Sequence, residues 1–119
     1  MKYMLLIYMG ENAMSESERE HCYVESTQLA RDLKSSGQYL AANPLQSVTT
    51  ATSLRVRNGK PLVTDGPFAE TREQLGGYYL IDAKNLDEAI AIASRIPGAK
   101  VGTVEIRPVI EIPGLPEGS

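Results

Sequence analysis

Asp65 is the carboxylate that the sequence places best for acid–base chemistry. It ends an expected β-hairpin and is followed at once by Gly66, Pro67 and Phe68. A carboxylate at the mouth of a cavity can act as a general base or bind a polar group of a ligand. An Asp that precedes Gly-Pro also commonly bonds its own backbone in a turn. The sequence leaves both roles of Asp65 open, the catalytic one and the structural one.

A second group of charged residues follows in the same loop, at Glu70, Arg72 and Glu73. The guanidinium of Arg72 could hold a carboxylate or a phosphate through two parallel hydrogen bonds. The same residues are more typical of a solvated loop, whose exposed ion pairs contribute less than about 1 kcal/mol each. Glu70 and Arg72 are therefore candidate ligand-binding residues.

Three residues of the expected sheet complete the candidate site: Tyr79, Glu105 and Arg107. If the polar residues of the last strand point away from the helices, Glu105 and Arg107 would enter a cavity between two sheets. Charges buried there would have to pair with each other or bind a ligand. A salt bridge on an edge strand would explain the two residues equally well.

Metal and cofactor chemistry have little support in the sequence. It contains a single cysteine, Cys22, and a single histidine, His21, and no Cys-x-x-Cys pair. Neighbours on a helix point about 100° apart, which makes His21 and Cys22 a poor catalytic pair. We expect Cys22 in the core, His21 at the surface, and neither a metal site nor a cofactor.

The elements that must position these residues follow a β-α-β-hairpin-β-α-β order. The expected ranges are strand 2–9, helix 16–36, strand 38–42, a hairpin turn at 58–59, strand 74–83, helix 86–96 and strand 101–109. Strands 2–9 and 74–83 are apolar on both faces, which indicates central strands. Asn58-Gly59 suits a type I′ turn, and Pro61 makes this hairpin an edge or a projecting arm.

This order predicts an α+β, ferredoxin-like βαββαβ sandwich with an inserted hairpin. We expect a single domain at 1–112 and a tail at 113–119. Both helices would cover one face of the sheet, and the other face would remain too apolar for water. The pattern therefore predicts a homodimer that packs sheet to sheet.

Composition restricts the partners of the protein. The 119 residues carry a net charge of −3 with an isoelectric point near 5.2, which argues against direct nucleic-acid binding. No stretch approaches the roughly 20 apolar residues of a membrane span, and residues 1–10 lack the features of a signal peptide. We expect a cytoplasmic protein.

The stretch Val63–Ile81, with the sequence VTDGPFAETREQLGGYYLI, resembles the core of the DGPF-type YCII-related family. Residues 2–8, 86–89 and 96–109 are similar to that family as well. The resemblance implies a dimeric α+β barrel with a cavity between the two sheets. Some members are encoded beside sigma factors of the extracytoplasmic-function type, so the resemblance also implies a transcription-factor partner.

The chain departs from the family pattern at two positions. The better-studied YCII proteins use a His on the first helix and an Asp before a Pro near the last strand. Here Ser26 stands near the position of that His, and Ile96 precedes Pro97. The resemblance therefore does not transfer a His–Asp catalytic pair to this chain.

Two functions of different classes remain. The first is a dimeric binding or regulatory module that takes a small polar or anionic ligand and acts in sigma-factor-dependent transcription. The second is a cofactor-free enzyme in which Asp65 is the acid or base and Arg72 or Arg107 orients an anion. The absence of the His–Asp pair favours the module, so whether the protein is an enzyme stays open.

Overall fold

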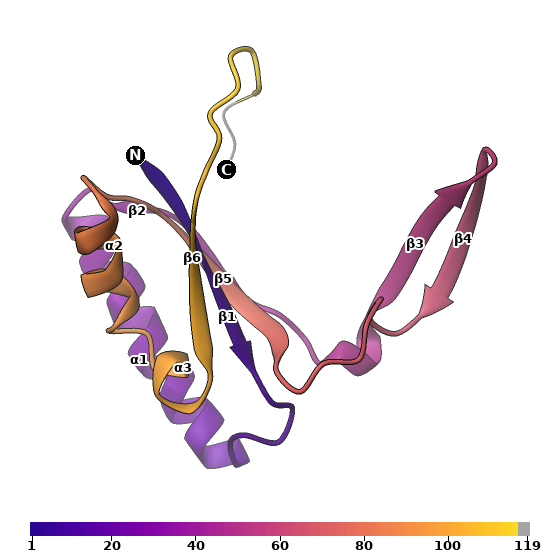
Figure 1. Cartoon of the computed structure of the whole chain (residues 1–119). Helices are drawn as coiled ribbons and strands as arrows, with labels where there is room; N and C mark the ends of the chain where they lie inside the picture. Colours follow the sequence, from indigo (N-terminus) through magenta and orange to yellow (C-terminus); the bar gives the residue numbers. More distant parts are fainter. Residues whose placement is uncertain (117–119) are drawn as a thin grey trace.

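The computed structural model describes residues 1–116, so the end of the expected tail lies outside it. Figure 1 shows a sheet with helices on one side and a long hairpin on the other. The elements are β1 (Lys2–Met9), α1 (Glu16–Ser35), β2 (Tyr39–Pro44), a 3₁₀ turn (Val48–Thr50), β3 (Thr52–Arg57), β4 (Lys60–Asp65), β5 (Gln74–Asp82), α2 (Leu86–Ala93), α3 (Gly98–Val101) and β6 (Thr103–Pro108).

The main sheet confirms the predicted ferredoxin-like α+β fold. Its four strands are antiparallel neighbours in the order β2-β5-β1-β6. The two strands predicted to be central, β1 and β5, are the central ones. Apolar residues on both faces of these strands had indicated this position, since such strands are typical of the centre of a sheet.

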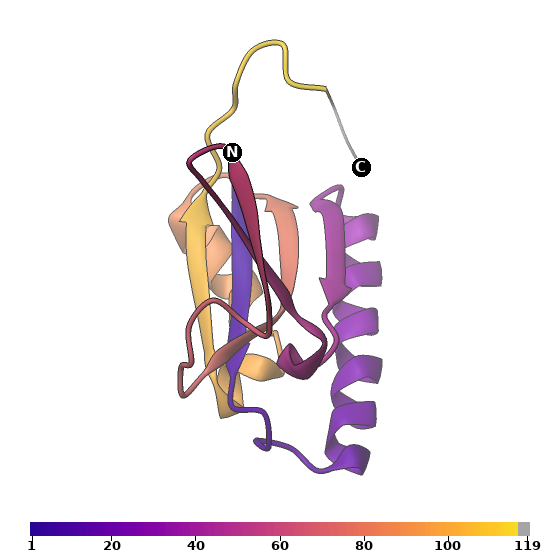
Figure 2. The ribbon, with the colours of Figure 1, turned by 90° about the vertical axis from the view of Figure 1, so that its right-hand side faces the viewer.

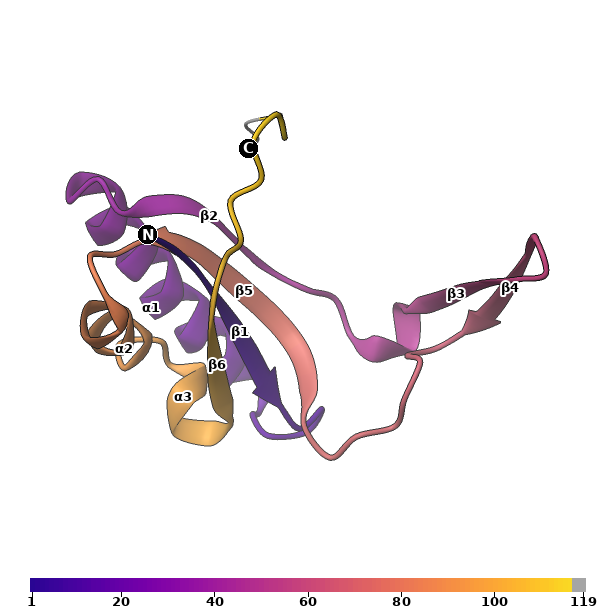
Figure 3. The same cartoon turned by 45° about the horizontal axis from the view of Figure 1, so that its top comes forward.

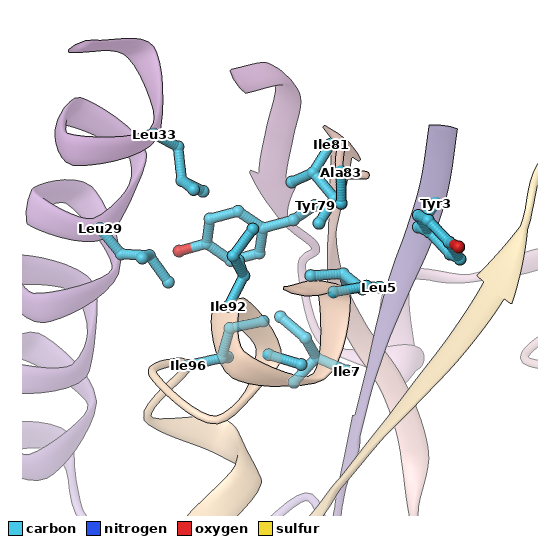
Figure 4. Close-up of a cluster of buried hydrophobic side chains, with 12 residues drawn as sticks. Tyr3, Leu5, Ile7, Leu29, Leu33, Tyr79, Ile81, Ala83, Ile92 and Ile96 are labelled. Atoms are coloured by element: carbon cyan, nitrogen blue, oxygen red, sulfur yellow. The ribbon is translucent and has the colours of Figure 1, made fainter. Parts of the chain in front are cut away.

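Two helices cover one face of the sheet, α1 on the β2 side and α2 on the β6 side. Figures 1 and 3 show both helices on this same side. The core between the layers takes alternate residues of β1 and β5, as period-two strands require. Figure 4 shows this core, which contains Tyr3, Leu5, Ile7, Leu29, Leu33, Tyr79, Ile81, Ala83, Ala89, Ile92, Ala93 and Ile96.

Local signals determine where both long helices begin. The Ser15 side chain accepts a hydrogen bond from the Glu18 backbone, and the Glu18 carboxylate accepts one from the Ser15 backbone. The Asn85 side chain caps α2 in the same way by accepting from the Glu88 backbone. These caps satisfy amide groups that have no partner inside the helix, so both predicted N-caps are confirmed.

Three predicted boundaries are wrong. Helix α2 ends at Ala93 rather than at residue 96. Strand β2 continues through Asn43 and Pro44, which pair with Tyr78 and Gly77 of β5; β2 is an edge strand, where a proline is tolerated. The last strand begins at Thr103 rather than Val101, because residues 98–101 form the short helix α3.

The second face of the main sheet carries no helix. Its half-exposed side chains alternate with the buried ones along β1 and β5. We call this surface the open face; its apolar residues are Met4, Leu6, Tyr8, Tyr78 and Leu80. No helix among the described residues combines the length and the apolar character needed to cross a membrane.

Strands β3 and β4 form a sheet of their own, which we call the arm. Asn58 and Gly59 have φ of 52° and 74°, as a type I′ turn requires. The predicted register is confirmed, with Arg57 opposite Lys60 and Leu54 opposite Val63. The arm projects away from the main sheet in Figure 1, as predicted from Pro61.

Candidate functional site

A cavity with a volume of about 310 Å³ lies between α1 and strands β2 and β5. We call it the α1 pocket. It is lined by Ile7, Met9, Cys22, Tyr23, Ser26, Thr27, Ala30, Tyr39, Ala42, Asn43, Pro44, Gly76, Gly77, Tyr78, Tyr79, Ile96 and Gly98. None of these residues is charged, so the pocket is an apolar space with a few hydroxyl, amide and thiol groups.

Tyr79 spans the space between the sheet and α1. Its side chain is only 3% exposed, and its ring points from β5 toward the helix in Figure 4. The phenol donates a 2.8 Å hydrogen bond to the backbone carbonyl of Ser26. Burial raises the pKa of Tyr79, and the hydrogen bond at Ser26 only partly opposes this shift. The phenol therefore stays protonated at neutral pH.

Cys22 and Ser26 lie one helical turn apart on α1 and both line the pocket. Burial raises the pKa of the Cys22 thiol, and a hydrogen bond with Ser26 partly opposes that shift. A thiol with a raised pKa is a weak nucleophile at neutral pH, because the thiolate is the reactive form. The pocket thus offers neutral hydrogen-bonding groups rather than an activated nucleophile.

Gly77 lets β2 and β5 approach closely beside the pocket. A side chain there would lie 3.1 Å from the Asn43 carbonyl oxygen and 3.3 Å from the Pro44 Cα. The register of β1 against β5 also shifts between Ile7 and Tyr8, next to this glycine. The Gly76-Gly77 pair therefore keeps the floor of the pocket free of side chains.

A second, more polar hollow of about 180 Å³ adjoins the α1 pocket and shares Met9, Cys22, Tyr23 and Gly76 with it. The Glu11 carboxylate accepts hydrogen bonds there from the Ser47 hydroxyl at 3.1 Å and the Val48 backbone at 2.9 Å. Arg19 and Gln74 line the same hollow. The Gln74 side-chain oxygen is buried and has no hydrogen-bond partner among residues 1–116.

Comparison with known proteins assigns the chain to a family. The model of the YCII-related domain matches residues 1–113. The chain belongs to the YCII-related family. It is also similar to an uncharacterized protein of Rhizobium meliloti (strain 1021), with 39% identity over 118 residues, which cover 92% of each chain.

In this YCII-related protein, the sheet separates the predicted binding residues. Tyr79 faces the helices and lines the α1 pocket, whereas Glu105 and Arg107 are exposed residues of β6 on the open face. The register places Glu105 beside Leu6 and Arg107 beside Met4. The three residues therefore form no common site within one copy of the chain. Glu105 and Arg107 point away from the helices, which is the condition under which they were candidates for a cavity between two sheets.

Asp65, Glu70 and Arg72 are exposed and line neither hollow. Asp65 is the last residue of β4, at the base of the arm. Glu73, from the same loop, accepts a 2.8 Å hydrogen bond from the Thr103 hydroxyl through its carboxylate. The structure thus brings none of the three predicted loop residues to Tyr79.

Asp65→Ala is expected to change the free energy of unfolding by less than about 0.5 kcal/mol, as for ordinary surface substitutions. The physical reason is that its carboxylate makes no hydrogen bond within residues 1–116, so no turn bond is lost. Urea unfolding would measure this, with Ser53→Ala as the comparison, because the Ser53 hydroxyl donates to the Gly66 carbonyl at 2.7 Å. A loss of about 1 kcal/mol or more in Asp65→Ala alone would restore the turn role.

Of the pocket residues of α1, Cys22 was interpreted from the sequence as a core residue. Cys22, Ser26 and Ala30 recur at every fourth residue, which places them on one face of the helix. The signal that could have revealed the pocket is their size: small side chains on a buried stripe leave space that Leu or Ile would fill. His21 lies outside the pocket, where its ring nitrogen pairs with Glu25 at 2.8 Å on the surface.

Proposed function

We propose that this YCII-related protein binds a small, neutral, mainly apolar molecule in the α1 pocket. The observation that carries the proposal is a cavity of about 310 Å³ that lacks a charged lining residue. Ligand sites typically measure roughly 300–1,000 Å³ and combine apolar walls with a few polar groups. A planar molecule with one hydroxyl or carbonyl group suits the Ser26, Thr27 and tyrosine hydroxyls around it.

Binding fits this pocket better than acid–base catalysis does. A general acid or base works best with a pKa near the working pH, whereas burial raises the pKa of both Cys22 and Tyr79 away from neutrality. The carboxylate of the enzyme hypothesis, Asp65, lies outside the pocket. An anionic ligand, as expected from Arg72 and Arg107, would have to bind elsewhere on the molecule.

The working form that we propose is a cytoplasmic homodimer packed sheet to sheet. Its support is the open face, where half-exposed Met4, Leu6, Tyr78 and Leu80 form an apolar surface. The Asp65–Phe68 motif further supports membership of the DGPF branch and a dimeric α+β barrel. A regulatory link to sigma-factor-dependent transcription, with a transcription-factor partner, follows only from that resemblance.

Ala30→Leu tests the pocket. The added side chain would occupy the cavity from α1, so ligand binding should be lost while the fold is kept. Differential scanning fluorimetry of the wild type would use phenol, indole and benzyl alcohol as probes. A probe at 100 times its dissociation constant should raise the melting temperature by roughly 10 °C, which corresponds to about 2.7 kcal/mol.

The matched control is Ala91→Leu, which makes the same change on the exposed side of α2. It should keep the full ligand-induced shift. If the probe raises the melting temperature of Ala30→Leu and Ala91→Leu by the same amount, the probe binds outside the α1 pocket. The absence of any shift in the wild type across the panel would contradict the proposed ligand class.

A further inference from the structure

The arm carries an apolar strip that nothing in the described part of the chain covers. Register places Leu54 opposite Val63 and Val56 opposite Pro61, so these four side chains share one face of the hairpin. Leu54, Val56 and Val63 are 61%, 58% and 66% exposed. Single exposed aliphatic residues are common on protein surfaces, but a continuous strip of this kind marks an interaction surface.

A free arm would also be poorly stable by itself. A two-stranded hairpin is marginally stable in water unless another surface packs against it. The Cα radius of gyration is 16.0 Å, whereas a compact chain of this length would have about 13–14 Å. The arm projects from the body instead of packing on it, so a surface that covers the arm would belong to another molecule.

The position of the arm indicates where that molecule lies. In Figures 1 and 2 the arm extends on the side of the sheet that has no helices, and it stands in front of the open face. The open face and the apolar strip are therefore two uncovered apolar surfaces that border the same space. A partner seated on the open face would lie within reach of the arm.

Charge favours a second copy of this chain as that partner. The arm carries Arg55, Arg57 and Lys60 against Asp65, a net charge of +2. The whole chain carries −3, so the remainder of the chain carries −5. The basic arm is thus attracted to the acidic body of another copy, since complementary charge steers and orients association.

We propose that each arm clasps the body of the other copy in a reciprocal dimer, with the strip of Leu54, Val56, Pro61 and Val63 buried on the partner. This inference rests on the proposed sheet-to-sheet dimer and adds a second contact to it. Two-fold symmetry makes the exchange reciprocal, so each contact of the strip occurs two times in the dimer, once for each arm. The arm would then decide the strength of the dimer, while the α1 pocket, which no residue of the arm lines, keeps its shape.

Val63→Ser tests the clasp, with Val24→Ser as its matched control. Val24 is a valine of α1 with nearly the same exposure, 69% against 66% for Val63. Burying a valine contributes about a tenfold change in affinity, and the change occurs twice in the dimer. Sedimentation equilibrium should therefore show a dissociation constant about a hundredfold higher for Val63→Ser and unchanged for Val24→Ser. Equal constants for the two variants would overturn the clasp.

Leu6→Arg separates this proposal from the sheet-to-sheet dimer. Leu6 lies on the open face, so its substitution should disrupt the sheet contact directly. If Leu6→Arg weakens the dimer and Val63→Ser does not, the result would support the sheet-to-sheet contact and contradict the clasp. A wild type that stays monomeric throughout would contradict both. If Val63→Ser still binds the probe, ligand binding in the α1 pocket does not depend on the clasp or on the sheet-to-sheet dimer.

Hydrogen exchange gives a readout that needs no substitution. In the clasp, amides of residues 52–65 should become protected as the protein concentration rises through the dimer transition. Rapid exchange of these amides at concentrations where the dimer predominates would overturn the proposal.

Discussion

Gly102→Ala is expected to destabilise the protein by about 3 kcal/mol, because the added methyl group has no room. It would collide with the carbonyl oxygen of Tyr8 and lie 3.0–3.1 Å from Met9. The Tyr8 oxygen and the nearby Met9 Cα belong to the backbone of β1, so neither can rotate away as a side chain would. Tyr8 also pairs with Thr103, where β6 begins. Relief of the clash would therefore require β1 and β6 to separate locally.

Gly10→Ala is the matched control, since the nearest atom to a new side chain there is the Arg72 carbonyl oxygen at 3.7 Å. Thermal unfolding should give a melting temperature at least about 10 °C lower for Gly102→Ala, and a small change for Gly10→Ala. Similar melting temperatures for the two variants would contradict the close approach of β1 at Gly102.

Leu5→Ala should cost about 2–5 kcal/mol of unfolding free energy, the usual range for a buried leucine. Leu5 is 0% exposed and belongs to the central strand β1. Its removal would leave a cavity among Tyr3, Ile7 and the other core residues of Figure 4, which the two-layer packing cannot easily close. Urea unfolding monitored by far-ultraviolet circular dichroism would measure the loss.

Leu86→Ala provides the comparison because Leu86, in α2, is 50% exposed. The same atoms are removed in both variants, so a difference in unfolding free energy reports burial rather than side-chain type. We expect Leu86→Ala to cost clearly less than Leu5→Ala. Equal costs would mean that β1 does not form the centre of the core.

Much of the fold was determined by signals that act within a few residues. The Ser15 capping box, the Asn85 cap and the Asn58-Gly59 turn each depend on local backbone chemistry, and all three are confirmed. The sequence also predicted the central positions of β1 and β5, because apolar residues on both faces are typical of strands at the centre of a sheet. The boundaries of β2 and β6 were wrong because pairing with β5 and the short helix α3 outweighed local preference.

The site depended on tertiary structure. Sequence patterns suggested that Tyr79, Glu105 and Arg107 belong together, but the direction of each strand residue is set by which face meets the helices. Packing turned Tyr79 toward α1, left Glu105 and Arg107 on the open face, and kept Asp65 at the base of the arm. The α1 pocket arises from small residues of α1 facing Gly76 and Gly77, which are distant in the chain. A cavity is the space left between elements, so its existence depends on how they pack and not on any one segment.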